Sequence, residues 1–209
     1  MIKTIEFKEE VYPKFQAEGF ASKFAFPFAQ QVCKGLGVDV GCSKIEWSYN
    51  DSKRHYCLKE KSYLKWILEK QRDVLHKLET FQDYVVYQKW YKFDYLSFPI
   101  DPSINEFNAT NFPEGCENLD YVFSSHCLEH ISNYVEALEY WKSKLKDKGV
   151  LFLYLPSSTQ RYWLPQHNRK HLHAFTPNII KECLEDLGFN NIFVSGIDLN
   201  NSFCAMCNK

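Results

Sequence analysis

Short apolar runs alternate along the chain with stretches in which apolar residues recur at helical spacing. Three of the runs, 35–42, 119–125 and 150–155, are rich in Val, Leu and Phe and end in a glycine turn, small polar residues or a proline. Buried parallel strands have this continuous apolar character because both of their faces are covered. The segments 191–196 and 203–207 predict two further strands.

Two segments between these runs predict helices with clear boundaries. Ser132 or Asn133 can cap a helix over 134–145, and lysines near its carboxyl end suit the helix dipole. A second helix begins after Thr176 and ends at Gly188, the residue type favoured for a left-handed carboxyl cap. Alternating strands and helices predict an α/β fold, with a mostly parallel sheet, helices on both faces and ligands at the carboxyl ends of the strands.

The segment 51–92 has a different character from the rest of the chain. Its apolar residues recur at spacings of three, four and seven among Lys, Glu and Gln, which indicates one long or two shorter amphipathic helices. Ten basic against six acidic residues give it a charge of +4, which we interpret as a solvated helix face. An apolar helical face must be buried somewhere, so we expect these helices to pack on the domain or to form a homodimer.

Length, composition and charge narrow the possible partners. The 209 residues, 45% hydrophobic and 24% charged, predict a single soluble domain over 1–209. A net charge of -1 removes the usual electrostatic case for nucleic acid or an anionic membrane, so we expect a small-molecule partner. The amino terminus lacks the apolar core of a signal peptide, and no run approaches the length of a membrane span. Eight Cys then predict reduced thiols and a cytoplasmic location.

Several short fragments stand in a characteristic order at the ends of the predicted strands. They are Val38-Asp39-Val40-Gly41-Cys42, Asp101-Pro102-Ser103, Asn108-Ala109, and Leu119 to His130 with its His126-Cys127-Leu128-Glu129-His130 end. In this order the chain resembles the class I S-adenosylmethionine-dependent methyltransferases, over about residues 35–195. The closest likeness is to a small branch that carries a His-x-Leu-Glu-His segment after the fourth strand and that is often linked to surface-polysaccharide pathways. The resemblance implies a Rossmann-like sheet and S-adenosylmethionine as cofactor.

The resemblance implies a cofactor site along the strand ends. A strand that ends Asp-x-Gly-x brings a backbone without Cβ against a ligand, which suits the loop of Asp39, Gly41 and Cys42. Asp101 resembles the family's acidic residue that accepts hydrogen bonds from both ribose hydroxyls. The pair Asn108 and Ala109 resembles the family's Asp-Ala pair beside the adenine amine, although Asn108 could instead form an Asx turn. Ser125 and His126 follow the fourth strand, where the family contacts the methionine portion.

Two intervals depart from the family's pattern. Asp39 and Asp101 are 62 residues apart, about three times what a helix and a strand require. The interval from Asp101 to Asn108 leaves no room for the usual helix and third strand. We therefore predict a helical insertion at about 51–95 and a shortened sheet beyond Asp101, with Asp94 as the alternative ribose acid.

Histidines are the predicted bases of the reaction. Methyl transfer from a sulfonium needs alignment and, for a hydroxyl acceptor, a base, and the ordinary pKa of His, about 6.5, lies near working pH. The resemblance places the acceptor pocket near the loop of His171 and His173, so we predict His130, His171 and His173 as catalytic candidates, followed by His126. An aromatic and His-rich loop suits a sugar, and we expect O-methylation of a sugar or of its activated or phosphorylated precursor.

Three alternative functions remain open from the sequence. The acceptor could be a small amine, or the chain could be a non-catalytic partner with a methyltransferase fold. His126-x-x-Glu129-His130 also matches a zinc-protease pattern, in which two His on a helix bind metal and the Glu acts as base. That interpretation lacks a third ligand and a second shell, so we expect no bound metal. His126 and His130 could also simply share one helix face.

Overall fold

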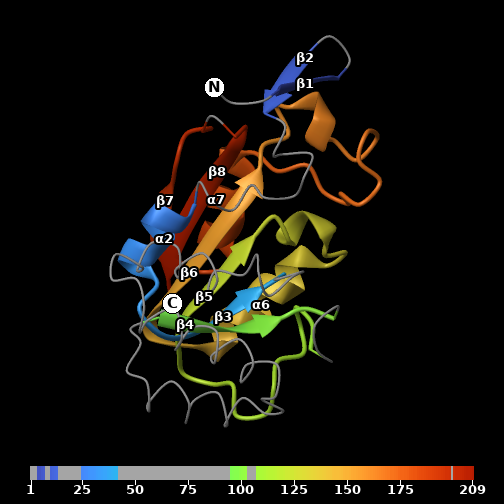
Figure 1. Ribbon diagram of the computed structural model, residues 1–209. Helices are drawn as coiled ribbons and strands as arrows, with labels where there is room; N and C mark the ends of the chain where they lie inside the picture. Colours follow the sequence, from blue (N-terminus) through green and yellow to red (C-terminus); the bar gives the residue numbers. More distant parts are fainter. Residues whose placement is uncertain (1–3, 8–9, 14–24, 42–94, 103–106, 199) are drawn as a thin grey trace, which may run out of the picture.

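The computed structural model describes residues 4–7, 10–13, 25–41, 95–102, 107–198 and 200–209 (Figure 1). Its centre is a six-stranded sheet in the order β4-β3-β5-β6-β8-β7. The strands are β3 (Gly35–Val40), β4 (Tyr95–Ile100), β5 (Leu119–Ser125), β6 (Leu145–Pro156), β7 (Asn190–Val194) and β8 (Ser202–Asn208). Neighbours among β4, β3, β5 and β6 pair in parallel, whereas β8 is antiparallel to both β6 and β7.

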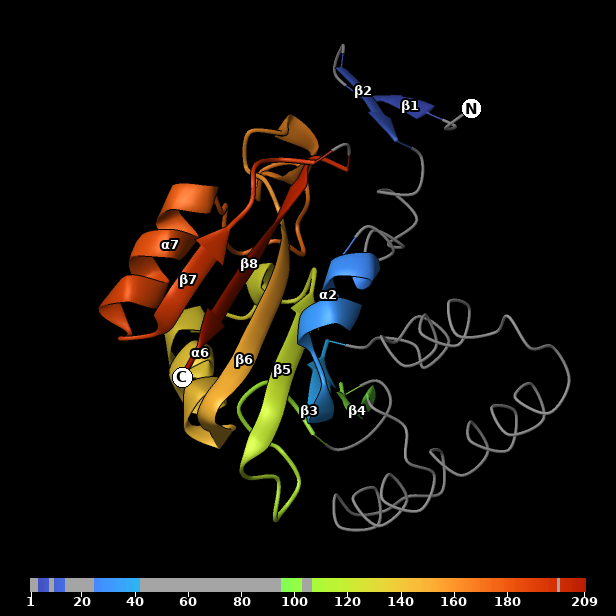
Figure 2. The same ribbon diagram turned by 90° about the vertical axis from the view of Figure 1, so that its left-hand side faces the viewer.

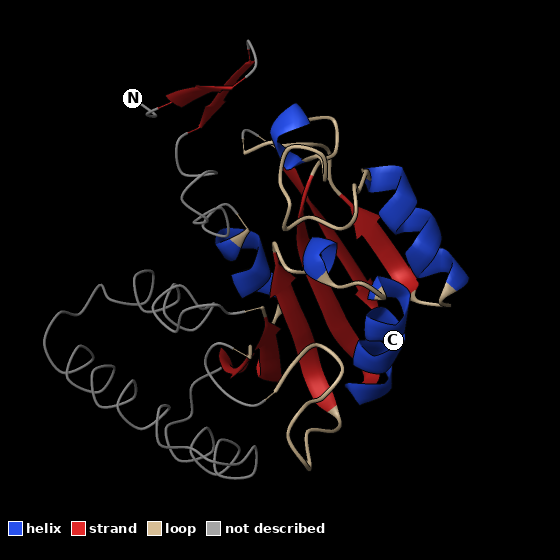
Figure 3. Ribbon diagram, turned by 90° about the vertical axis from the view of Figure 1, so that its right-hand side faces the viewer, coloured by secondary structure: helices blue, strands red, loops and turns tan. Residues whose placement is uncertain are grey.

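Helices cover both faces of this sheet. Helix α2 (Phe26–Val32) lies on one face, and α6 (Tyr134–Lys144) and α7 (Pro177–Asp186) lie on the other (Figures 2 and 3). Side chains of each strand alternate between the faces: Phe123 and Phe152 pack beneath α2, and Val122 and Leu151 pack towards α6 and α7. The predicted α/β fold, with a mostly parallel sheet covered on both sides, is therefore confirmed.

Capping residues set the ends of α6 and α7 as the sequence indicates. The Asn133 side chain accepts a hydrogen bond from the backbone N–H of Glu136, 3.3 Å away, at the start of α6. Thr176 does the same for Ile179 at the start of α7. Gly188 follows α7 with φ of 70°, as expected of a left-handed carboxyl cap.

Some elements differ from the sequence-based expectation. Strand β6 begins at Leu145, five residues before the predicted Val150, and its pairing with β5 shifts register near this start. Helix α2 and a separate hairpin of β1 (Thr4–Phe7) and β2 (Glu10–Pro13) were not predicted.

The predicted insertion at 51–95 lies outside the described residues, except for Tyr95, which begins β4. Cys42 and Asp94 also lie outside them, so the helical arm and the homodimer stay predictions. Among the described strands, β4 forms one edge of the sheet, with no strand beyond it, as the predicted shortening of the sheet after Asp101 requires. No helix in this described part is long and apolar enough to cross a membrane.

Candidate functional site

Two predicted cofactor-binding carboxylates lie at the carboxyl ends of neighbouring strands. Val40 of β3 pairs with Ile100 of β4, so Asp101 directly follows the paired ends, and Asp39 lies one residue before the end of β3. Asp39 is 4% exposed, and Asp101 is half-buried. The structure thus brings both carboxylates to one edge of the sheet, as the sequence predicts.

The backbone at Gly41 allows the ends of three strands to approach one another closely. Gly41 donates its N–H to the carbonyl of Ile100, 2.9 Å away, and has φ of 85°, which L side chains rarely adopt. A Cβ built on Gly41 would lie 2.3 Å from the Cβ of Cys127, which follows β5. Burial raises the pKa of the Cys127 thiol, and the nearby carboxylates of Asp101 and Asp39 contribute in the same direction. The ends of β3, β4 and β5 therefore meet closely around Gly41.

The predicted adenine-binding pair has structural contacts of its own. The Asn108 side-chain oxygen accepts from the backbone N–H of Thr110 at 2.9 Å, which is the Asx turn that the sequence left open. The Ala109 carbonyl accepts from the indole N–H of Trp141 at 2.7 Å. These bonds fix the loop at the surface, and contact of the pair with adenine stays a prediction.

His126 is partly buried and directly follows β5, next to Ser125. Its backbone has φ of 48°, and its N–H donates to the carbonyl of Tyr154 at 2.8 Å. The ring nitrogen Nε2 is 3.1 Å from the hydroxyl of Ser202. Burial lowers the pKa of His126 to about 3, so the imidazole is neutral at neutral pH.

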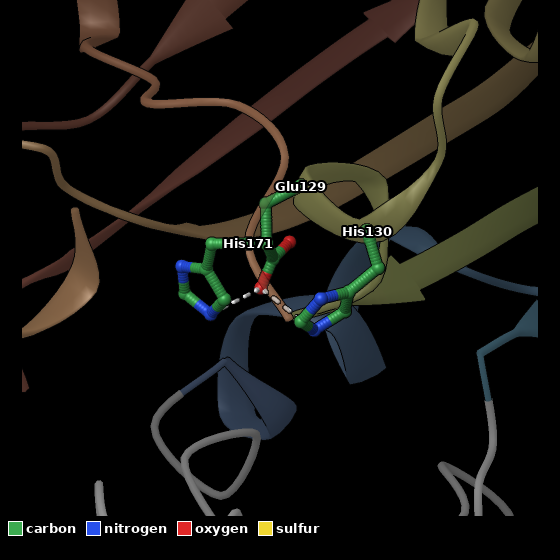
Figure 4. Close-up of side chains that lie close together, drawn as sticks. All are labelled: Glu129, His130 and His171. Carbon is green, nitrogen blue, oxygen red and sulfur yellow. Dashed lines mark ion pairs between the residues drawn. The ribbon is translucent and has the colours of Figure 1, made fainter. Parts of the chain in front are cut away.

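Glu129 lies between the imidazoles of His130 and His171 (Figure 4). It belongs to the short 3₁₀ helix η3 (Leu128–His130) and is fully buried. Neither carboxylate oxygen has a hydrogen-bond partner among the described residues. Its Oε1 lies 3.8 Å from Nδ1 of His126, 3.7 Å from Nε2 of His130 and 3.9 Å from Nε2 of His171. We call Glu129 and these three histidines the histidine cluster.

Backbone carbonyls fix the orientation of two imidazoles in the cluster. Nδ1 of His130 is 2.6 Å from the carbonyl of Lys170, and Nδ1 of His171 is 2.7 Å from that of Trp163. A carbonyl only accepts, so each Nδ1 carries the hydrogen and each Nε2 keeps a lone pair on the side of Glu129. The His171 ring also stacks on Trp163, with 5.3 Å between ring centroids.

Burial sets the charge of the cluster. It raises the pKa of Glu129 to about 8 and lowers the pKa of His171 to about 4. The pKa of His130 is also lowered, mainly by burial. Desolvation disfavours the charged form of each group, so at neutral pH the imidazoles are neutral and the Glu129 carboxyl is mostly protonated.

The structure groups only some of the predicted catalytic residues. His130 and His171 face each other across Glu129, whereas His173 places Nε2 2.9 Å from the carbonyl of Ile131 and packs against Tyr134. His126 and His130 do not share a helix face, because His126 precedes η3 with a positive φ. The sequence named Glu129 within the His-x-Leu-Glu-His segment and the zinc-protease alternative, but not as a predicted site residue, and nothing in the spacing showed that His171 would join it.

Comparisons with known proteins agree with this architecture. A family model described as a methyltransferase domain matches residues 21–194. No curated protein sequence matches the chain significantly.

Two of the matching solved structures share the fold at low sequence identity. A Thermotoga maritima S-adenosylmethionine-dependent methyltransferase, described as a possible histamine N-methyltransferase, has 13% identity and a TM-score of 0.55, and the match covers 94% of each chain. An Archaeoglobus fulgidus S-adenosylmethionine-dependent methyltransferase has 16% identity and a TM-score of 0.50, over 90% of this chain and 92% of that one. A phosphoethanolamine N-methyltransferase of Haemonchus contortus, solved with S-adenosylhomocysteine, has 23% identity and a TM-score of 0.36. That match covers 43% of this chain, which spans only 22% of the Haemonchus protein.

Proposed function

Because the chain belongs to the methyltransferase domain family, which uses S-adenosylmethionine as methyl donor, we propose that it methylates a hydroxyl group of a small molecule. The acceptor we favour is a sugar, or an activated or phosphorylated sugar precursor of a surface polysaccharide. The observation that carries the proposal is the placement of two carboxylates and the histidine cluster at the carboxyl ends of adjacent parallel strands. Ligands of open α/β sheets bind along this edge.

The donor end of the site lies at β3 and β4. Asp101 would accept from the ribose hydroxyls, and Asp39 would organise the ammonium group of the methionine portion directly or through water. Gly41, which follows β3 with φ of 85°, presents a backbone without a side chain at the same edge. These roles come from the family resemblance and from the placement of the residues.

The acceptor end lies at the histidine cluster. Methyl transfer displaces a sulfonium that is already a good leaving group, so the protein has to align the acceptor and activate its hydroxyl. Of the predicted bases, His130 is the most accessible in the cluster, with a side chain 37% exposed and a lone pair on Nε2. His171 is buried, and the Nε2 of His173 faces backbone carbonyls instead.

Titration calorimetry with S-adenosylhomocysteine tests the donor end. We expect micromolar binding and thermal stabilisation of the wild-type protein, because a ligand that binds the native state raises its stability. Asp101→Asn should weaken binding roughly 10- to 100-fold, since a hydrogen bond to a charged group contributes about 1.5–3 kcal/mol. Asp147→Asn is the matched control, because Asp147 is exposed near the start of β6, at the other end of the strand.

The result also decides between an enzyme and a binding partner. If millimolar S-adenosylhomocysteine gives neither binding heat nor thermal stabilisation, the result would favour the non-catalytic alternative. With binding established, release of S-adenosylhomocysteine in the presence of free sugars, nucleotide sugars or small amines distinguishes the hydroxyl acceptor from the amine. Turnover with amines alone would contradict the proposed O-methylation.

A further inference from the structure

Three potential metal ligands converge at the acceptor end of the site. One carboxylate oxygen of Glu129 and one ring nitrogen each of His130 and His171 lie within 4.8 Å of one another (Figure 4). They come from η3 and from the loop between β6 and α7, which are about 40 residues apart in the chain. We propose that these three side chains bind a divalent cation of the Zn²⁺ type.

The orientation of the two imidazoles favours a cation between them. The carbonyls of Lys170 and Trp163 accept from Nδ1, so both Nε2 lone pairs lie near the same oxygen of Glu129, at 3.7 and 3.9 Å. When Glu129 is ionised, its oxygen and the two lone pairs have no hydrogen to share in this arrangement, so a bound cation would take the place of the carboxyl proton. Metal-binding histidines almost always donate their second ring N–H to a carbonyl or carboxylate in the same way.

The burial of Glu129 is an independent observation. Its side chain is fully buried, and both carboxylate oxygens lack a hydrogen-bond partner among the residues that the structure describes. A buried carboxyl group without partners is costly, and buried charges in proteins are normally paired or bound to metal. A divalent cation would satisfy the carboxylate and both imidazole lone pairs at once.

The donor set and its spacing indicate the class of metal. Imidazole nitrogens suit zinc and similar transition metals, and a carboxylate oxygen completes a common set of three protein ligands. Zinc bonds of about 2.0–2.1 Å place tetrahedral ligands about 3.4 Å apart. The observed separations are 3.7 and 3.9 Å to Glu129 and no more than 4.8 Å between any two of the ligand atoms, so the side chains would move inward to bind zinc.

Three protein ligands leave a coordination position for water or substrate. The exposed side of His130 gives solvent access to the cluster. The role of the metal rests on the proposed function: a cation there would lower the pKa of a coordinated acceptor hydroxyl, whose proton would then pass to solvent water instead of to His130. Metal binding itself does not depend on which acceptor the enzyme uses.

This inference departs from the metal-free site that the sequence favours. The sequence offers only the His126 and His130 pair, without a third ligand or a second shell. The structure replaces His126 by His171 and adds both missing parts, because the loop after β6 returns to η3 and supplies the Lys170 and Trp163 carbonyls. The backbone carbonyl of Glu129 accepts from the N–H of Leu172 at 2.8 Å, which ties this loop to η3.

Calorimetric titration with ZnCl₂ tests the site on protein that has been freed of metal with a chelator. We expect one zinc per chain, bound about tenfold or more weakly by Glu129→Gln and by His171→Ala. His173→Ala is the matched control, because it removes an imidazole from the same loop but outside the cluster. Circular dichroism checks that each variant is folded, and Glu129→Gln keeps the side-chain volume if His171→Ala does not fold.

The outcomes separate this inference from the proposed function. Absence of zinc binding, or equal binding by wild type and all three variants, would overturn the metal site, since bound zinc would then lie elsewhere. If S-adenosylhomocysteine still binds in that case, the methyltransferase assignment stands. Zinc binding that depends on Glu129 and His171, without methylation of any hydroxyl acceptor, would support the metal site and count against the O-methylation.

Discussion

Substitution of Gly41 by alanine should destabilise the protein through two separable effects. Gly41 has φ of 85°, and a non-glycine residue in left-handed conformation costs about 1–2 kcal/mol. The added Cβ would lie 2.3 Å from the Cβ of Cys127 and 2.5 Å from its sulfur, so the ends of β3 and β5 would have to move apart. Overpacking of this kind costs about 1–3 kcal/mol, which gives a total of roughly 2–5 kcal/mol.

Two other glycines make matched controls for these effects. Gly115 has φ of 78°, and nothing lies within 4 Å of the position that a Cβ would take there, so Gly115→Ala measures the backbone cost alone. Gly196 has neither a positive φ nor a neighbour within 4 Å of its added Cβ, so Gly196→Ala should change stability little. All three substitutions stiffen the unfolded chain alike, and this contribution cancels in the comparison.

Urea unfolding followed by tryptophan fluorescence gives the free energy of unfolding of each variant. The stability should fall in the order Gly196→Ala, Gly115→Ala, Gly41→Ala, with about 1–3 kcal/mol between the last two. In a Cys127→Gly background, Gly41→Ala should lose most of this extra cost, because the clashing Cβ is gone. If Gly41→Ala and Gly115→Ala differ by less than about 0.5 kcal/mol, the close approach of β3 and β5 is wrong.

Other predictions concern the core and its thiols. Trp141→Phe should lower the free energy of unfolding in urea by about 1–3 kcal/mol, because it leaves the Ala109 carbonyl without its donor. Trp163→Phe should lower it less, since the Trp163 indole N–H has no partner among the described residues, and equal losses would contradict this. Burial raises the pKa of Cys207 to about 12, so little of it is thiolate at pH 8. Iodoacetamide should therefore label Cys207 far more slowly than the half-buried Cys183, and peptide mass spectrometry can measure the two rates. Faster labelling of Cys207 in the native protein would show that the end of β8 opens.

Local signals in the sequence predicted those elements whose ends are chemically marked. β5 has the predicted bounds, Leu119–Ser125, because a continuous apolar run stops at two serines. α7 is bounded by a Thr cap and by Gly188, which are both readable without the structure. By contrast, among the side chains that the structure describes, the fully buried residues of α2 and its two caps are Ala25, Ala29 and Cys33, which are small and do not stand out as an apolar face in the sequence.

The residues of the candidate site also fall into those that the sequence could predict and those that it could not. Asp39, Gly41 and Asp101 could be predicted because each stands at a strand end that the sequence itself marks. The partnership of Glu129 with His171 could not, because it depends on the path of the loop after β6 rather than on local spacing. Local spacing suggested the pairing of His126 with His130 on a helix, which the positive φ of His126 prevents.

The contact between Gly41 and Cys127 has a consequence for how this protein could be altered. Asp39, Gly41 and Asp101, which we propose for the donor, stand at the ends of β3 and β4, whereas the histidine cluster belongs to segments after β5 and β6. The contact between Gly41 and Cys127 joins the two groups. The two ends of the site are therefore encoded in separate stretches of the chain. Exchange of the loop between β6 and α7 with that of a relative should change the acceptor and preserve donor affinity, as long as Gly41 and Cys127 are kept together.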